Sequence, residues 1–399
     1  MSYDVAALRA RFPALRAGIA HFDGPGGSQV PDAVAGAVGA AMTSPLANRG
    51  TVTVGERAAD GIVLGARAAT ADLLGADPRG IVFGRSMTAL TFDLARTLAA
   101  GWGPGDEVVV TRLDHDANVR PWVLAADAAG ATVRWLDFDS ETCELDDIAS
   151  VLSERTRLVA VTGASNLVGT CPDVPRIADA VHRAGALLMV DGVHLTAHAT
   201  IDLPALGADF FACSPYKFLG PHCGVLAADP ALLETLHPDK LAPSTDAVPE
   251  RFELGTLPYE LLAGTTAAVD TLAGIAGSPL TDRRAALRTS MAAVHEHEDG
   301  LRARIEKGLG ELPGVRVRSR AGARTPTLLV TFDDRDPLAA HRFLAERRVS
   351  APSGSFYALE ASRRLGLGDT GSLRIGLAPY VDESDVDRLL DGLAAFVEP

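Results

Sequence analysis

Short runs of apolar, largely β-branched residues alternate with stretches of helical periodicity from about residue 60 to residue 230. Seven such runs, each ending in a polar residue or a glycine, are RGIVFGRS, DEVVVTRLD, ATVRWLDFD, TRLVAVTGAS, ALLMVDGVH, ADFFACS and CGVLAAD. Helix-like segments such as TALTFDLARTLAAG and VPRIADAVHRAG lie between several of them. This alternation predicts an α/β fold with a large, mostly parallel, seven-stranded sheet covered by helices on both faces. Ligands of such sheets bind beyond the carboxyl ends of the strands, so the residues just after each run are the candidates for chemistry.

The pattern changes after about residue 258, where it becomes almost wholly helical up to residue 312. The segment 283–312 is long enough for a helix that links two domains. The runs TPTLLVTFD, DPLAAHRFLAERR, GSLRIGLAPY and DESDVDRLLDGLAAFV then predict a small α+β domain. We therefore expect a large domain over 26–275 and a small C-terminal domain over 276–399 that includes the linking helix. The N-terminal segment 1–25 is expected to pack on the small domain.

Composition and charge narrow the class of protein. A chain of 399 residues is too long for one minimal core, in agreement with a large and a small domain. The net charge of −14 and the absence of any Lys/Arg run argue against nucleic acid or an anionic membrane as a partner. The first thirty residues lack an apolar signal core, and no uncharged apolar run reaches membrane-spanning length, so we expect a cytoplasmic protein. The four cysteines form no Cys-x-x-Cys pair, which indicates free thiols.

Lys217 is an isolated cation in apolar, glycine-broken surroundings, ADFFACSPYKFLGPHCGV, directly after a predicted strand. A lysine in such surroundings loses its proton more readily, which favours Schiff-base chemistry. The alternative is a lysine whose apolar stem packs at the strand end while the ammonium group reaches water.

Two other strand ends carry candidate ligands for a planar, phosphorylated molecule. Ser86, Met87 and Thr88 open a predicted helix, and their amides and hydroxyls could hold a phosphate; the alternative is an ordinary helix cap. His115 follows the next strand and offers a flat ring that could stack on a planar cofactor, although a loop histidine is more often simply solvated.

Polar residues also follow the strands that end near residues 162 and 191. Asn166 offers an amide to a ligand oxygen, and Asp191 is a carboxylate that needs a cationic or hydrogen-bonded partner unless it is a helix cap or turn residue. His194 and His198 have the i, i+4 spacing of a zinc-binding helix. Leu195 stands where a metalloprotease carries its glutamate, and no third ligand is apparent, so we predict no metal site.

These residues make sense together as one site for pyridoxal 5'-phosphate. That cofactor needs a lysine for its aldehyde and a carboxylate to keep its ring nitrogen protonated. It also needs a ring against its π face and a helix N-terminus for its phosphate. All four occur here, each at a predicted strand end.

The ordered motifs SMTAL, LDHDANVRPW, ASNLVGT, DGVH, SPYKFLGP, RFELGTLP and LRIG resemble the class V aminotransferase family, in the branch that contains the cysteine desulfurases. The resemblance covers essentially the whole chain, and DGVH and SPYK are its most specific parts. It implies the fold-type I architecture of pyridoxal-phosphate enzymes and a homodimer with its sites at the subunit interface.

The resemblance assigns the residues around the cofactor ring. It implies that Lys217 forms the Schiff base and moves the substrate's α-proton. Asp191 would pair with the ring nitrogen, and His115 would stack on the ring and take part in catalysis. Asn166 and His194 would reach the ring's phenolate oxygen or its neighbourhood, and Asn166 would also contact the substrate.

The remaining implied contacts are to the phosphate and to the substrate. Met87, Thr88 and Ser214 would bind the phosphate, with Thr256 arriving from the other subunit. Tyr216 stands where desulfurases often have histidine, and it would bond the phosphate through its hydroxyl or simply pack.

Arg374 of SLRIG would clamp the substrate carboxylate through a two-pronged, charge-assisted bond. The loop before it, VSAPSGSFYALE, lacks the cysteine on which cysteine desulfurases form a persulfide. Ser355 and Tyr357 occupy this presumed substrate loop, together with Phe356. Cys213 and Cys223 flank the lysine, but small buried residues are the simpler interpretation of both.

The sequence thus predicts a pyridoxal-phosphate enzyme that acts on an L-amino acid, with lysis of Cβ–S or another Cβ–X bond favoured by the desulfurase-like motifs. Transamination and epimerisation at Cα stay open as alternatives. A non-catalytic scaffold is the remote alternative, because a scaffold has no need of Lys217, Asp191 and Arg374 together.

Overall fold

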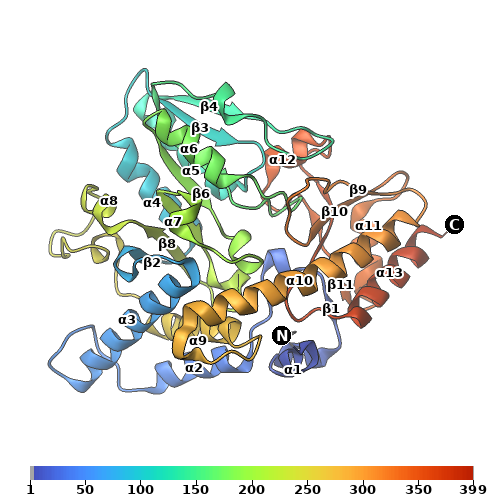
Figure 1. Ribbon diagram of the computed structural model, residues 1–399, viewed down its shortest axis with the longest axis horizontal. Coiled ribbons are helices and arrows are strands. Elements are labelled where there is room, and N and C mark those ends of the chain that lie inside the picture. Colours follow the sequence, from blue (N-terminus) through green and yellow to red (C-terminus); the bar gives the residue numbers. More distant parts are fainter. Residues whose placement is uncertain (1–3, 399) are drawn as a thin grey trace.

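The seven predicted strands form a single sheet in the computed structural model, which describes residues 4–398 (Figure 1). The strands lie in the order β2, β8, β7, β6, β5, β3, β4. Their bounds are β2 Ile81–Gly84, β3 Glu107–Thr111, β4 Thr132–Leu136, β5 Thr156–Thr162, β6 Leu187–Asp191, β7 Phe210–Cys213 and β8 Gly224–Ala228. Neighbours are parallel except at β8, which runs antiparallel to β2 and β7. The prediction of a mostly parallel sheet is therefore confirmed.

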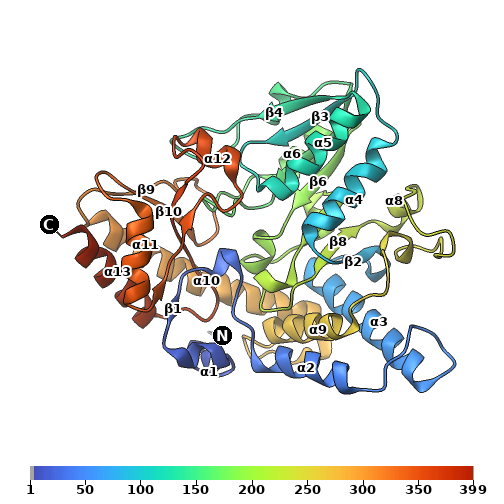
Figure 2. The same ribbon diagram turned by 180° about the vertical axis from the view of Figure 1, so that it is seen from behind.

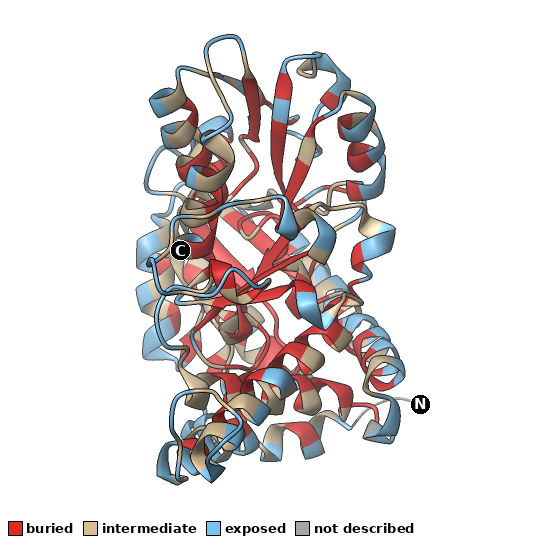
Figure 3. Ribbon diagram, turned by 90° about the vertical axis from the view of Figure 1, so that its left-hand side faces the viewer, coloured by how far each residue is buried: buried red, intermediate tan, exposed pale blue. Residues whose placement is uncertain are grey.

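The sheet is buried on both faces, which explains its continuous apolar runs. Successive strand residues point to opposite faces, so Val109 and Val159 belong to one apolar cluster while Val108 and Leu158 belong to the other. The edge strand β4 alternates between exposed and partly buried residues instead. Figure 3 shows the buried residues gathered along the middle of the molecule.

Helices cover the two faces. The helices around this sheet are α2 Asp32–Thr43, α3 Val54–Leu74, α4 Met87–Ala99, α5 Arg120–Ala129, α6 Val174–Arg183, α7 Leu203–Leu206, α8 Pro230–Glu234 and α9 Tyr259–Ala273. Apolar residues of α4 and α5 pack in one cluster, and those of α3, α6 and α9 pack in the other. The two amphipathic layers thus bury the strands between them.

Helix α10, Arg283–Gly310, runs from the helices beneath the large sheet to a second, smaller sheet (Figures 1 and 2). That sheet has the order β12, β13, β10, β9, with all of its pairs antiparallel. Its strands are β9 Val315–Val317, β10 Thr327–Phe332, β12 Ser353–Gly354 and β13 Ser372–Gly376, and its helices are α11 Pro337–Glu346, α12 Leu359–Arg364 and α13 Glu383–Val397. No helix within residues 4–398 is long and apolar enough to cross a membrane.

The N-terminal segment lies against the C-terminal part of the chain. Strand β1, Ala20–His21, pairs in parallel with β11, Val349–Ser350. In the last turn of helix α1, Val5–Ala10, the side chain of Arg9 donates a hydrogen bond of 2.6 Å to the carbonyl of Tyr380. The domain boundaries at residues 25 and 275 stay predictions.

Candidate active site

A cavity of about 640 Å³ lies beyond the carboxyl ends of the large sheet's strands and is closed on one side by residues of the small sheet. Strand β4 lies beside β3 on one side, and the next strand in the chain, β5, lies beside β3 on the other. The strand order therefore reverses at β3, and ligands bind at such switch points. The sequence-predicted site residues that line the cavity are Met87, Thr88, His115, Asn166, Asp191, His194, Ser214, Tyr216, Lys217, Tyr357 and Arg374. Two others do not line it: Thr256 is exposed, and Ser355 lies in the loop with its carbonyl bonded to the amide of Ala358.

At one end of the cavity, helix α4 presents its N-terminus. Ser86 caps the helix by accepting a 3.1 Å hydrogen bond from the amide of Ala89. The amides of Met87 and Thr88 lie in the first turn, where a helix offers no carbonyl partner, so they are donors for an anion.

Gly224 on β8 allows the backbone at this end to come close. A Cβ on Gly224 would lie 2.2 Å from the carbonyl carbon of Ser86 and 2.4 Å from the nitrogen of Met87. Only glycine therefore lets β8 pass directly beneath the start of α4.

Lys217 reaches the middle of the cavity from the turn after β7. Its Nζ donates a hydrogen bond to the carbonyl of Pro25 and lies 4.7 Å from the centroid of the Tyr216 ring. Burial, with a further contribution from the charge of Arg374, lowers the pKa of Lys217 to about 7. The apolar surroundings of Lys217 in the sequence predict a shift in this direction.

Tyr216 packs in the wall beside the lysine. Its ring stacks on His222, with centroids 4.7 Å apart and planes 11° apart. Burial raises the pKa of its phenol, so the hydroxyl keeps its proton and stays a donor.

Asp191, the last residue of β6, is a buried carboxylate on the floor of the cavity. Its Oδ1 accepts a 2.9 Å hydrogen bond from the amide of Val193, and burial raises its pKa to about 6. No arginine or lysine hydrogen-bonds it in the described part of the chain, so the site leaves room for a cationic partner supplied by a ligand.

Asp114 is a second buried acid that the sequence reasoning missed. It accepts hydrogen bonds from the hydroxyl of Thr111 and, at 2.7 Å, from Nδ2 of Asn118. Burial is the main cause that raises its pKa to about 8, and the nearby Asp191 adds to the shift. Burial thus favours the neutral form of this acid at neutral pH.

His115 presents a neutral ring. Its Nδ1 accepts a 3.0 Å hydrogen bond from the amide of Ala117, and burial lowers its pKa to about 4. The ring stacks on Tyr357, with centroids 5.4 Å apart and planes 29° apart.

His194 connects the cavity to the small sheet. Its Nε2 lies 3.0 Å from Oγ1 of Thr325 and 2.9 Å from Oγ1 of Thr327. Burial holds its pKa well below the ordinary value, so the ring is neutral. Behind it, His198 contacts the ring edge and hydrogen-bonds Glu298 of α10 at 2.8 Å.

Arg374 on β13 is 2% exposed and provides a cation from the small-sheet side. Its Nη1 donates a 2.9 Å hydrogen bond to the backbone carbonyl of Asn166, while its Nε is buried without a partner. A buried unpaired donor costs about 1–3 kcal/mol, and a carboxylate bound at the Nε–Nη2 edge would remove that cost. Burial lowers the pKa of the guanidinium to about 9, which leaves it charged at neutral pH.

Asn166 and the loop before β13 hold each other in place. Nδ2 of Asn166 donates a 2.9 Å hydrogen bond to the carbonyl of Phe356, and its Oδ1 is buried without a partner. Oδ1 is thus free to accept from a ligand, and the second N–H of Nδ2 can still donate to a ligand oxygen, so the predicted contact of this amide stays a prediction. Phe356, which belongs to the presumed substrate loop, also lines the cavity and covers the guanidinium of Arg374.

None of the four cysteines lines the cavity. Cys143, Cys213 and Cys223 are buried, and Cys171 is partly buried. Burial raises the pKa of Cys171 and of Cys223 to about 11, so neither is a reactive thiolate at neutral pH.

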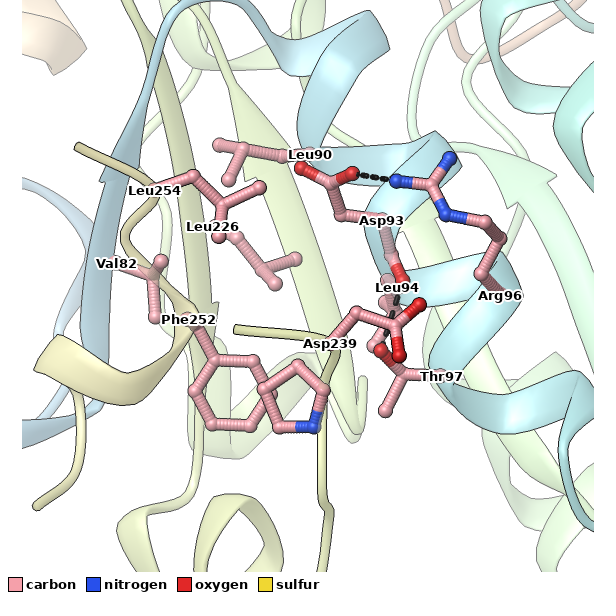
Figure 4. Close-up of a pocket in the computed structure, with 11 residues that line it drawn as sticks. Val82, Leu90, Asp93, Leu94, Arg96, Thr97, Leu226, Asp239, Phe252 and Leu254 are labelled. Atoms are coloured by element: carbon pink, nitrogen blue, oxygen red, sulfur yellow. Dashed lines mark hydrogen bonds and ion pairs between the residues drawn. The ribbon is translucent and has the colours of Figure 1, made fainter. Parts of the chain in front are cut away.

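A much smaller cavity, of about 40 Å³, lies between α4, β2, β8 and the segment 238–254 (Figure 4). Val82, Leu226 and Phe252 line it, and the side chains of Asp93 and Arg96 bond each other there. Thr97 and Asp239 also line it, but at this size it has no room for a cofactor or an amino acid. No cluster of three or more potential metal ligands occurs among the described residues.

Comparisons with known proteins agree with this arrangement. The sequence model of the family described as aminotransferase class V matches residues 20–389. A probable cysteine desulfurase from Pseudomonas aeruginosa is 31% identical, over 98% of this chain and 98% of its own length. The crystal structure of the cysteine desulfurase CsdA from Escherichia coli has a TM-score of 0.86 at 27% identity, covering 99% of this chain and 98% of that one. A C-DES mutant with glycine covalently linked to its PLP (pyridoxal phosphate) cofactor shares the fold, with a TM-score of 0.78 at 21% identity over 97% of this chain and 98% of that one.

The residues of the cavity fit that cofactor. Asp191 is a buried carboxylate that lacks a cationic hydrogen-bond partner, as a protonated ring nitrogen requires. The helix N-terminus above Gly224 offers amides to a phosphate, and Lys217, with its lowered pKa, lies in the same cavity. The neutral ring of His115 adds a flat surface.

Proposed function

This chain belongs to the class V aminotransferase family, and we propose that it cleaves a Cβ–X bond, such as Cβ–S, of an L-amino acid without forming a persulfide on a cysteine of its own. Dependence on pyridoxal phosphate is shared by the family. The specific reaction is our proposal, and the absence of any cysteine from the cavity carries it.

Lys217, Asp191 and His115 would hold the cofactor ring, and Met87, Thr88 and Ser214 would hold its phosphate. Bound pyridoxal phosphate supplies an electron sink for bonds broken at the substrate's Cα. Asp191 keeps that sink effective, because its carboxylate stabilises a positive charge on the ring nitrogen.

Arg374 would bind the substrate carboxylate at its open Nε–Nη2 edge and so place Cα near Lys217. The amine of Lys217, with a pKa of about 7, is substantially deprotonated at neutral pH and removes the Cα proton. The electron pair of the Cβ–X bond leaves with X. Overall, one amino acid and one water give pyruvate, ammonia and HX, a balanced elimination that needs no thiol.

Product analysis tests this proposal. The holoenzyme is incubated with L-cysteine and with 3-chloro-L-alanine, before and after alkylation with iodoacetamide, alongside a Cys171→Ser variant. We expect pyruvate in every case, because no thiol takes part. Alanine formation with sulfur bound to the protein, abolished by alkylation, would contradict it.

The same assay separates the alternatives. Transfer of the amino group to a second 2-oxo acid identifies an aminotransferase, and loss of optical activity without product identifies an epimerase. A protein that binds no cofactor and converts no amino acid would be a scaffold.

The active enzyme is also proposed to be a homodimer in which Thr256 of a second copy completes the phosphate site. In a single chain Thr256 is exposed and outside the cavity. Large apolar side chains are exposed on α2, α3 and the neighbouring segments, namely Met42, Val52, Val54, Leu64, Leu241 and Leu254. Light scattering gives the mass, and mixing inactive Lys217→Ala chains with inactive Thr256→Val chains should restore part of the activity.

A further inference from the structure

The loop before β13 carries two aromatic residues in an unusual backbone conformation. Phe356 has φ 52° and Tyr357 has φ 59°, in the left-handed region that non-glycine residues adopt only at an energetic cost. Consecutive residues of this kind persist when the surroundings fix them. Asn166 Nδ2 donates to the carbonyl of Phe356 at 2.9 Å, and the amide of Asp116 donates to the carbonyl of Tyr357 at 2.7 Å.

The fixed loop brings the Phe356 ring onto Arg374. The guanidinium carbon lies 3.6 Å from the ring centroid, so the ring covers one face of the cation. Because Nη1 already donates to the carbonyl of Asn166, the Nε–Nη2 edge remains for a carboxylate. Any ligand held at that edge therefore lies beside the Phe356 ring.

Apart from Lys217, Asp191 and Arg374, the charged side chains among the described residues that line the cavity are those of Asp116 and Arg120. Phe92, Ala117 and Val193 are apolar lining residues. The cation of Arg120 is paired with Asp116 at 3.1 Å. A charged substrate side chain would thus lose water without gaining an ionic partner.

We propose that Phe356 determines which substrates the enzyme accepts: its ring is the wall of a subsite beside Arg374 that takes an L-amino acid with an uncharged, apolar side chain. This inference rests on the proposed function, because it names the substrate class of the same site. The ring shields the guanidinium from water, which strengthens the attraction to the substrate carboxylate, and it contacts the substrate's side chain directly.

Binding of carboxylic acids without an amino group tests the subsite apart from the chemistry, since such acids cannot react with the cofactor. Propanoate, 3-methylbutanoate and butanedioate are titrated into the holoenzyme by calorimetry. We expect 3-methylbutanoate to bind most tightly and butanedioate most weakly. In Phe356→Ala, binding of 3-methylbutanoate should weaken by roughly 2- to 30-fold and the preference over butanedioate should shrink. Phe356→Tyr should retain both.

Phe343→Ala is a matched control. Arg347 stacks on Phe343 with its guanidinium carbon 3.5 Å from the ring centroid, the same type of contact outside the cavity. This variant should bind all three acids as the wild type does, and circular dichroism and cofactor absorbance check that each variant is folded and loaded.

Two results would overturn the inference: equal or tighter binding of 3-methylbutanoate to Phe356→Ala, or a wild-type preference for butanedioate. Failure of the proposed function has a different signature. In that case the acids bind in the expected order while cysteine and 3-chloroalanine yield no pyruvate.

Discussion

The two walls of the cavity are built in different ways. On the large-sheet side, Asp191 ends its strand, and Lys217 and His115 follow theirs by four residues. On the small-sheet side, Arg374 lies inside strand β13 and is held by a carbonyl 208 residues away in the chain. The groups to which we assign the chemistry thus lie at local strand ends, whereas the wall that we propose to select the substrate is held by long-range contacts.

Replacing the central group of the sheet side should have the largest effect. Lys217→Ala should lose the visible absorbance of bound cofactor and at least about 10³-fold of activity, because it removes both the anchor and the base. Absorbance spectra and pyruvate assays measure this. Lys307→Ala, on the exposed face of α10, should behave as the wild type does. A Lys217→Ala enzyme with normal turnover would contradict the assignment.

The corresponding change on the small-sheet side should reduce substrate use while sparing the cofactor. Arg374→Gln should lower kcat/KM by roughly 10²–10³-fold, because two charge-assisted hydrogen bonds to the carboxylate are lost. The visible cofactor band should remain. Arg316→Gln on the same small sheet, where the exposed arginine pairs with Asp333, serves as the control. Loss of the cofactor band in Arg374→Gln would show that the small-sheet wall is needed for cofactor binding as well as for substrate binding.

The contrast between the walls also explains what the sequence could and could not predict. The seven strands and the residues at their ends follow from apolar runs that stop at a polar residue. Local pattern therefore made Lys217, Asp191 and His115 candidates, each with an ordinary structural alternative, and only their combination and the family resemblance pointed to one site. Strands β1, β9, β11 and β12 are two or three residues long and carry no such pattern. Asp114 was missed because nothing local distinguishes a buried acid from a turn residue. The position of Phe356 depends on Asn166, 190 residues away.

Helix α10, which links the two sheets, should matter for the stability of the protein more than for its chemistry. Glu298 on α10 is buried and hydrogen-bonds His198, which contacts the ring of His194. Glu298→Gln should lower the free energy of unfolding by about 2 kcal/mol, because a hydrogen bond to a charged group is replaced by a weaker one. Urea unfolding measures it. Glu383→Gln removes an exposed partner of Arg304 and should cost less than about 0.5 kcal/mol. If the two variants lowered the free energy of unfolding by the same amount, the buried hydrogen bond of Glu298 would not contribute to stability as we expect.

The last effect is a slope rather than a single change, and it concerns the pH dependence of stability in the cofactor-free protein. Folding lowers the pKa of Lys217 from 10.5 to about 7, so between these values the unfolded chain binds more protons and stability rises with pH. This one group contributes a slope of at most about 1.4 kcal/mol per pH unit. Lys217→Met should remove that slope and be relatively more stable at and below pH 7. Urea unfolding at several pH values checks the sign, and an unchanged slope would contradict the lowered pKa.

The close passage of β8 beneath α4 at Gly224 limits which residues can occupy this position in natural variants. Since even one methyl group there would meet the backbone of Ser86 and Met87, a saturation library should tolerate no other residue at this position. Variants that change it should lose cofactor binding, because the start of α4 carries the amides to which we assign the phosphate. Among homologous sequences, a residue other than glycine at this position would therefore predict loss of cofactor binding even where the lysine is retained.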